Sequence, residues 1–145
     1  MIYFGQGLKN IGELKAGETL VVSGAAGAVG AIACQLGKFM GAKVYAIAGT
    51  EEKCEWLEKE CGVEKAFNYK SPTFLTDFKK TVKYLDVYFD NVGGDILDFM
   101  LTRLNKYARI VMCGEQIFPL RDLGGNLIWI IYLQALFPPI VRFSL

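Results

Sequence analysis

The chain has 145 residues, of which 52% are hydrophobic and 21% charged, and its formal net charge is +1. This length is typical of one domain, and so large an apolar fraction excludes a disordered chain. A near-neutral charge without a basic run argues against a nucleic-acid partner. The most apolar stretch, Leu127–Phe137, is too short to span a membrane. We therefore expect a single domain over residues 1–145 with neither a nucleic-acid nor a membrane partner.

The chain contains no histidine and four cysteines, none of which form a Cys-x-x-Cys pair. Histidine is the commonest general base and a frequent metal ligand, so its absence argues against a metal site built by this chain. We interpret the cysteines as reduced thiols of a cytoplasmic protein that carries no signal peptide. Any demanding chemical step must then come from a cofactor or from residues outside the chain.

Apolar runs alternate with helical periodicity along the chain. Strands are predicted at Thr19–Ser23, Lys43–Ala48, Ala66–Tyr69, Leu85–Asp90 and Arg109–Cys113. These runs are nearly continuous, which is typical of parallel strands covered on both faces. The alternation predicts an α/β fold: a doubly wound parallel sheet (Rossmann fold) of about six strands with helices on both faces. Ile140–Phe143 is the candidate for the sixth strand.

Four helical stripes separate the predicted strands. Their apolar positions lie within residues 29–40, with Phe39 among them, and within residues 54–61, 74–82 and 96–104. Ser71 and Pro72 are expected to begin the third helix, and Asp95 is expected to cap the fourth. The pattern weakens beyond Gly114, where Leu127–Phe137 is a further candidate helix.

The segment after the first predicted strand is rich in small residues and reads Ser23-Gly24-Ala25-Ala26-Gly27-Ala28-Val29-Gly30. A strand, such a turn and a helix form the dinucleotide-binding motif, in which Ala25, Gly27 and Gly30 take the three glycine positions. Gly27 would let the backbone approach a pyrophosphate, and Gly30 would let the helix pack close to the strand. The helix N-terminus would then bind the anion. We predict a dinucleotide site; the alternative is a turn that only tightens the connection.

The end of the second predicted strand lacks the carboxylate with which NAD-preferring proteins usually bind the ribose hydroxyls. Thr50 is expected to cap the next helix, whose first turn contains Glu51, Glu52 and Lys53. The helix dipole disfavours a cation at this place, whereas a ribose 2′-phosphate would favour it. The sequence therefore predicts NADP(H) rather than NAD. The alternative is that Lys53 is an ordinary surface lysine.

These segments, together with four others, stand in the order and at the spacing of a known family. The matching segments are Tyr3-Phe4-Gly5, Ala25-Ala26-Gly27-Ala28-Val29-Gly30, Gly49-Thr50-Glu51-Glu52-Lys53, Phe67-Asn68-Tyr69-Lys70, Phe89-Asp90-Asn91-Val92-Gly93-Gly94 and Cys113-Gly114. The chain resembles the zinc-independent medium-chain dehydrogenases/reductases, and within them the group of prostaglandin reductases, leukotriene hydroxydehydrogenases and alkenal reductases. The resemblance covers their cofactor-binding domain and implies that the family's N-terminal catalytic domain is absent from this chain.

The resemblance implies hydride transfer from NADPH to the C=C bond of an α,β-unsaturated aldehyde or ketone, with no catalytic residue assigned within the chain. The cofactor residues that it implies are Gly27, Ala28 and Val29 at the pyrophosphate, Lys53 and Tyr69 at the 2′-phosphate, Asn91 near the ribose or nicotinamide, and Cys113 and Gly114 beside the nicotinamide half. Gly30 of the turn and Thr50 at the helix start are counted among the cofactor-binding residues as well. Tyr69 could instead close its strand by packing alone. The loop Glu115–Pro119 departs from the family's pattern, so no contact is assigned there.

Several alternatives stay open. A quinone oxidoreductase of the same superfamily, or a nucleotide-binding fragment without turnover, would share the motifs above. A short-chain dehydrogenase is disfavoured because no Tyr-x-x-x-Lys pair occurs. As a surface helix, Leu127–Phe137 would expose an apolar patch too large for a monomer. We therefore expect a homodimer through this segment, as in related reductases; burial in the domain's own core is the alternative.

Overall fold

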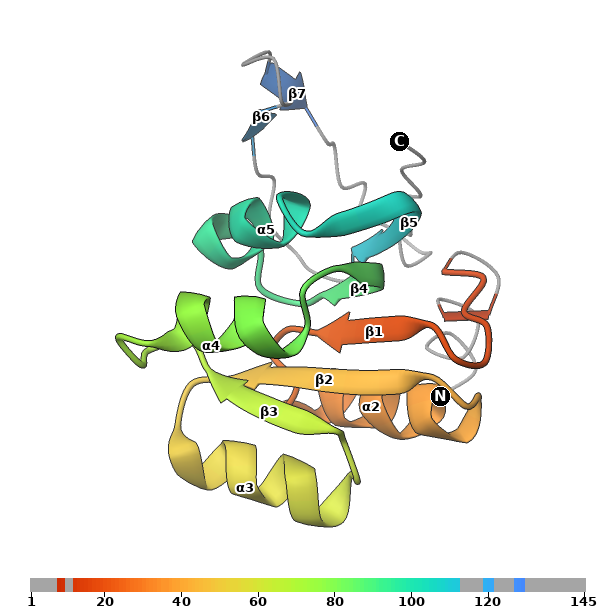
Figure 1. Cartoon of the computed structure of the whole chain (residues 1–145), viewed down its shortest axis with the longest axis vertical. Helices are drawn as coiled ribbons and strands as arrows, with labels where there is room; N and C mark the ends of the chain where they lie inside the picture. Colours follow the sequence, from red (N-terminus) through yellow and green to blue (C-terminus); the bar gives the residue numbers. More distant parts are fainter. Residues whose placement is uncertain (1–7, 10–11, 113–118, 122–126, 130–145) are drawn as a thin grey trace.

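The computed structural model describes residues 8–9, 12–112, 119–121 and 127–129. Strands and helices alternate along the central range (Figure 1), in the order β1 (Thr19–Val22), α2 (Ala28–Phe39), β2 (Lys43–Ala48), α3 (Glu51–Glu60), β3 (Lys65–Asn68), α4 (Phe74–Thr81), β4 (Leu85–Asp90), α5 (Gly94–Leu101) and β5 (Leu104–Met112). Each strand predicted within this range is present. The bounds of β2 and β4 are as predicted, whereas β5 begins at Leu104 rather than Arg109.

The five strands form a parallel sheet in the order β3-β2-β1-β4-β5. The chain places β2 and β3 on one side of β1 and then crosses to place β4 and β5 on the other. Val21 in the central strand is in register with Tyr45 of β2 and with Tyr88 of β4. Because the strands are parallel, the ends of β1 to β4 share one edge of the sheet, at the arrowheads in Figure 1. The strand order reverses between β1 and β4, where ligands bind in open α/β sheets.

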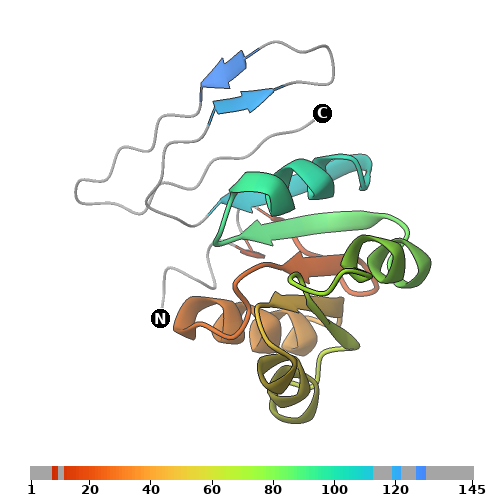
Figure 2. The same ribbon diagram turned by 90° about the vertical axis from the view of Figure 1, so that its left-hand side faces the viewer.

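Alternate residues of the strands contribute to two separate apolar clusters. Leu20 and Val22 of β1 pack in the cluster that contains the buried residues of α2 and α3. Val21, which lies between them, packs in the cluster that contains the buried residues of α4 and α5. Figure 2 shows these helices on the two sides of the sheet. The predicted doubly wound α/β fold with helices on both faces is therefore confirmed.

Arg109 of β5 fixes the segment that precedes β1. Its guanidinium donates to the carbonyl oxygens of Gly12 (2.7 Å) and Glu13 (3.0 Å) and to Oε1 of Glu18 (2.9 Å). Burial alone would raise the pKa of Glu18, but the hydrogen bonds from Arg109 and from the Lys15 N–H outweigh it, and the pKa is lowered. A partly buried ion pair thus ties the start of the domain to the last strand of the parallel sheet.

The start of α4 differs from the prediction. The helix begins at Phe74 with Thr73 at its N-cap, not at Ser71 and Pro72. The carbonyl of Ser71 accepts the Phe74 N–H at 3.1 Å, and its hydroxyl accepts the Thr73 N–H at 3.3 Å. The carbonyl and the hydroxyl of Ser71 are therefore both used in a turn that precedes the helix.

The start of α5 differs as well. Gly93, with a φ of 72°, takes the N-cap position and Gly94 begins the helix, so Asp95 lies in the first turn and does not cap it. The physical reason lies in Asp90, whose carboxylate accepts the Gly93 N–H at 3.1 Å. This hydrogen bond fixes the backbone at Gly93, so the helix already begins before Asp95.

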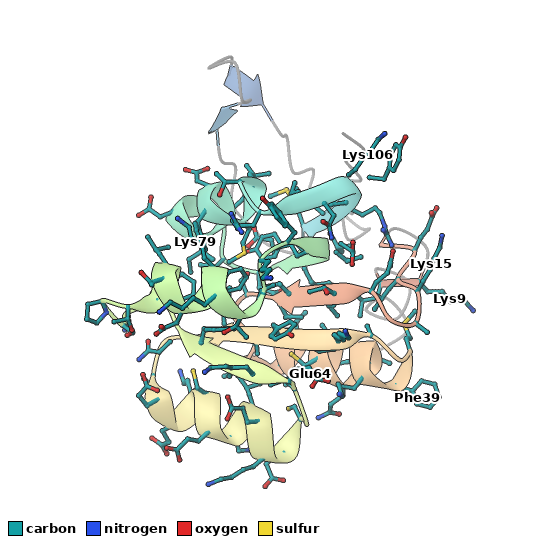
Figure 3. The ribbon with its side chains drawn as sticks, in the orientation of Figure 1. Lys9, Lys15, Phe39, Glu64, Lys79 and Lys106 are labelled. Carbon is teal, nitrogen blue, oxygen red and sulfur yellow. The ribbon has the colours of Figure 1, made fainter. Side chains whose placement is uncertain are left out.

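Phe39 does not join the core, although it falls in the first helical stripe. Its side chain is 90% exposed and points away from the sheet at the end of α2 (Figure 3). The buried face of α2 contains Gly30, Ala33, Cys34 and Gly37. Phe39 follows the buried Gly37 by two residues, which correspond to a rotation of roughly 200° around the helix axis. Its side chain therefore lies on the face opposite to Gly37.

Leu127–Trp129 form a strand, so the helix prediction is wrong for these three residues. This strand, β7, pairs antiparallel with β6 (Pro119–Arg121), and Ile128 is in register with Leu120. A short apolar run does not distinguish a helix from a strand, and β-branched and aromatic residues favour the strand. The rest of Leu127–Phe137 and the candidate strand Ile140–Phe143 lie outside the described residues. No helix within the described ranges is long and apolar enough to cross a membrane.

Candidate functional site

The carboxyl edge of the sheet brings together four segments that are far apart in the sequence. They are residues 23–27 after β1, residues 49–50 after β2, residues 68–70 at the end of β3 and residues 90–93 at the end of β4, all at the arrowheads in Figure 1. Backbone bonds extend the strand pairing to this edge. The Ser23 N–H donates to the Phe89 carbonyl at 3.0 Å, and the Tyr69 N–H donates to the Ala48 carbonyl at 3.1 Å. The four segments therefore form one continuous rim.

The turn between β1 and α2 presents backbone donors that the helix does not use. Gly24 has a φ of 56°, and its carbonyl accepts the Gly27 N–H at 3.1 Å, which closes the turn. The first bond of α2 runs from the Ala31 N–H to the Gly27 carbonyl, at 2.9 Å. The N–H groups of residues 28–30 precede this bond, and no side chain at the N-cap accepts from them. Together with the positive end of the helix dipole, they can bind an anion.

Gly30 allows α2 to begin directly against the turn. A β-carbon at this position would lie 2.4 Å from the Gly24 oxygen and 2.6 Å from Cα of Ala25, and both atoms belong to the backbone. At Gly27 a β-carbon would meet only the Gly24 oxygen, at 3.3 Å. Packing therefore requires glycine at position 30, whereas Gly27 leaves the approach to the helix N-terminus open.

Thr50 caps α3, as predicted. Its Oγ1 accepts the backbone N–H of Lys53 at 3.2 Å. Lys53 lies in the first turn with Glu51 and Glu52, and its side chain is exposed. None of the ion pairs between described residues involves Lys53. Its positive charge, at the start of the helix that follows β2, is thus available to an anionic ligand.

Tyr69 packs against the end of β2. A β-carbon at Gly49 would come within 3.2 Å of Cε1 and 3.4 Å of the hydroxyl oxygen of Tyr69, so the ring covers this glycine. The side chain is still 41% exposed, and Nζ of Lys70 lies 5.8 Å from its ring centroid. The ring therefore has the packing role of the alternative interpretation. The glycine that it covers directly precedes Thr50, the N-cap of the helix that contains Lys53.

Asn91 is held through both its backbone and its side chain. Its N–H donates to Oγ of Ser23 at 3.0 Å, and its Nδ2 donates to the Ser23 carbonyl at 2.8 Å. Cβ of Asn91 also lies 3.2 Å from the place that a β-carbon on Gly24 would take. Asn91 is thus fixed beside the glycine-rich turn between β1 and α2, which we call the phosphate turn. Its Oδ1 accepts no hydrogen bond from the described residues.

Asp90 is the buried centre of this edge, and its role was not foreseen from the sequence. Its Oδ1 accepts from the Ser23 hydroxyl (2.9 Å), the Tyr88 hydroxyl (2.9 Å) and the Gly93 N–H (3.1 Å). Asp90 is only 3% exposed, and a buried carboxylate needs several donors. The network joins the ends of β1 and β4 to the start of α5. An acid directly after the apolar run Val87-Tyr88-Phe89 was the signal that could have indicated it.

Tyr88 serves this network as a donor. Burial, and to a smaller extent the negative charge of Asp90, raises the pKa of Tyr88 well above its ordinary value. The phenol therefore keeps its proton at neutral pH and continues to donate to Asp90.

The site fits an anionic, nucleotide-like ligand better than a metal ion. Within the described residues, no three histidine, cysteine, aspartate or glutamate side chains lie close enough together to hold a metal. Two sources of positive potential, the N-terminus of α2 and Lys53, lie along one edge of the sheet. Cys113 and Gly114, which the resemblance assigns to the nicotinamide half, lie outside the described residues.

Comparison with known proteins identifies the family. The family described as "Zinc-binding dehydrogenase" matches residues 28–130. The chain belongs to this family. It is 48% identical over 117 residues to the Bacillus subtilis protein YfmJ, whose name includes the words NADP-dependent oxidoreductase, and 45% identical over 114 residues to prostaglandin reductase 1 of Bos taurus. Each alignment covers 77% of this chain but 33% and 34% of the relatives, so the chain spans about a third of the length of the curated relatives that it matches.

A solved structure agrees with these relatives. The crystal structure of CurA from Vibrio vulnificus in complex with NADPH superposes with a TM-score of 0.74 at 41% identity, over 79% of this chain and 35% of that chain. These matches confirm the resemblance to the zinc-independent medium-chain dehydrogenases/reductases. The name of the Bacillus subtilis relative includes NADP, and the CurA structure contains NADPH, so both agree with the cofactor predicted from the sequence.

Proposed function

We propose that the chain is the NADP(H)-binding domain of an oxidoreductase that transfers a hydride from NADPH to the C=C bond of an α,β-unsaturated aldehyde or ketone. The observation that carries the proposal is that two groups suited to bind anions lie on one edge of the sheet. The N-terminus of α2 presents the N–H groups of residues 28–30, which the bonds of the helix do not use, and the first turn of α3 presents Lys53 without an acidic partner among the described residues. NADPH carries anionic groups at two such places, its pyrophosphate and its 2′-phosphate.

The residues of the site have distinct roles in this proposal. Residues 27–30 bind the pyrophosphate, and Lys53 and Tyr69 bind the 2′-phosphate beside Thr50. Asn91 lies at the ribose or nicotinamide side, where the resemblance alone also assigns Cys113 and Gly114. When bound, NADPH supplies the hydride. A charge-assisted hydrogen bond from Lys53 to the phosphate is worth about 1.5–3 kcal/mol, enough to decide between the two nicotinamide cofactors.

The substrate class rests on the family resemblance. Relatives named prostaglandin reductase 1 and NADPH-dependent curcumin reductase, the latter 41% identical and from Escherichia coli, support an assignment to this reductase group. We extend the proposal to a homodimer through Leu127–Phe137, whose first three residues form β7. We also place the protein in the cytoplasm, where the free thiols of Cys34, Cys54 and Cys61 would stay reduced.

The second candidate function is nucleotide binding without turnover. It requires only the two anion-binding groups described above, the N-terminus of α2 and Lys53. The quinone oxidoreductases are the nearest chemical alternative to enone reduction.

The experiment that tests the proposal follows NADPH oxidation by the chain with a 2-alkenal, an enone and a quinone in turn. We expect micromolar NADPH binding and oxidation with the alkenal or the enone. Oxidation with the quinone alone would reassign the chain to the quinone oxidoreductases. Binding of NADPH without oxidation by any acceptor would support the second candidate and contradict the enzyme proposal for this chain.

A further inference from the structure

A single side chain, Asn68, joins the end of β3 to the first turn of α3. Its Nδ2 donates to Oε1 of Glu51 at 2.9 Å, and its Oδ1 accepts the Lys70 N–H at 3.0 Å. The two partners flank the proposed 2′-phosphate site, because Glu51 shares its helical turn with Lys53 and Lys70 follows Tyr69. We propose that Asn68 is a positioning residue that sets the preference for NADPH over NADH. This inference rests on the proposed NADP(H) site.

The hydrogen bond from Asn68 engages the Glu51 carboxylate, which would otherwise favour the binding of NADH. Proteins that prefer NAD bind the ribose hydroxyls through a carboxylate near the end of the second strand. Glu51, the first residue of α3, follows the end of β2 at Ala48 by three positions and is the first acid after it. A free carboxylate there could accept from the ribose hydroxyls and would repel a 2′-phosphate. The Asn68 amide engages it instead.

The bond to Lys70 shapes the other side of the site. The Ser71 N–H donates to the Asn68 carbonyl at 3.1 Å, so side chain and backbone of Asn68 together hold the turn at residues 68–71. This turn seats the Tyr69 ring on Gly49 and places Nζ of Lys70 5.8 Å from the ring centroid. Lys70 therefore adds a second positive charge beside the Tyr69 ring.

The replacement Asn68→Asp tests the role of the amide. The aspartate keeps the oxygen that accepts the Lys70 N–H, but it sets a second carboxylate against Glu51. We expect NADPH affinity to fall about tenfold and NADH affinity to change less than about twofold, because only NADPH carries the 2′-phosphate. In the double replacement Asn68→Asp with Glu51→Gln, the new amide at position 51 can donate to the new carboxylate at position 68. One hydrogen bond is thereby restored with donor and acceptor exchanged. It should return the ratio of the two affinities to within about threefold of the original.

A matched control is available at Asn105, whose Nδ2 donates to Oδ1 of Asp86 at 2.8 Å in a similarly exposed pair. Asp86 lies near the start of β4, away from the carboxyl edge. Asn105→Asp should lower thermal stability to a similar extent and leave the NADPH-to-NADH affinity ratio unchanged. If Asn68→Asp does not fold, Asn68→Ser can be used, because a serine hydroxyl can still accept in the turn but is too short to reach Glu51. Its affinity ratio should fall as well.

Two results would overturn the inference while leaving the proposed function intact. One is an unchanged ratio in the folded Asn68 variant, and the other is a double variant that does not recover the ratio. If the unmodified chain itself binds NADPH and NADH equally, the proposed NADP(H) site fails first and the inference fails with it.

Discussion

The hydroxyl of Ser23 lies 2.9 Å from Oδ1 of Asp90, so a buried hydrogen bond joins the end of β1 to the end of β4. The same hydroxyl accepts the Asn91 N–H at 3.0 Å. These two strands are neighbours at the point where the strand order of the sheet reverses. One side chain thus connects the strand before the phosphate turn with the residue proposed to lie at the nicotinamide side of the cofactor.

Replacement of Ser23 by alanine should weaken both the fold and the site. The variant removes one of the donors of a buried carboxylate, which costs about 1–3 kcal/mol of unfolding free energy. It also removes the acceptor of the Asn91 N–H. Asn91 is then held less firmly at the cofactor site, so NADPH should bind less tightly. Urea denaturation and NADPH titration measure the two effects. As a control, Thr102→Ala removes an exposed bond to the Phe99 carbonyl (2.7 Å) and should cost less without changing NADPH affinity. Equal effects of the two variants would contradict the role of Ser23.

Two glycines of the phosphate turn should respond differently to alanine. Gly30→Ala places a β-carbon 2.4 Å from the Gly24 oxygen, and the backbone must move to accept it. We expect a loss of roughly 2–4 kcal/mol of stability, together with weaker NADPH binding. Gly27→Ala meets that oxygen only at 3.3 Å, so it should reduce NADPH affinity with a smaller loss of stability. Thermal unfolding with and without NADPH separates the two. The reverse order of stability losses would contradict the close approach at Gly30.

Alkaline pH should destabilise the protein through a buried thiol. Burial, with a smaller contribution from the nearby Cys61, raises the pKa of Cys34 from 9.0 to about 12. Between these values the unfolded chain loses the thiol proton while the folded chain keeps it, so the free energy of unfolding falls as pH rises above 9.0. This contribution is complete below pH 9.0 and declines by up to about 1.4 kcal/mol per pH unit above it. Urea denaturation across this range should show a shallower decline for Cys34→Ala. Identical slopes would argue against a raised thiol pKa.

Features coded by short segments could be predicted from the sequence. The bounds of β2 and β4 follow from nearly continuous apolar runs, and Thr50 caps α3 because its hydroxyl reaches the Lys53 N–H within the same turn. The glycine turn is likewise local, since its closing bond joins Gly24 and Gly27. These interactions depend on neighbouring residues alone, which is why their patterns could be recognised.

Features that depend on distant partners could not be predicted. Ser23 and Asp90 are 67 positions apart, and only the register of β1 with β4 makes them neighbours. The start of β5 at Leu104 could not be predicted, because Tyr107 has a φ of 64° and the pairing with β4 shifts between Leu85 and Val87. Leu127–Trp129 pair with a second short strand, which an apolar run alone does not reveal. Tertiary pairing decided each of these outcomes.

Lys53 is the residue proposed to give this chain its preference for NADPH over NADH. The most direct test of this proposal is titration of the chain with NADPH and with NADH, repeated with Lys53→Ala. We predict that NADPH binds at least about tenfold more tightly than NADH and that the variant loses most of this difference, about 1.5–3 kcal/mol of charge-assisted binding. Lys59→Ala, in the last turn of the same helix, is the matched control and should leave the difference unchanged. Equal affinity of the unmodified chain for NADPH and NADH would contradict the proposal.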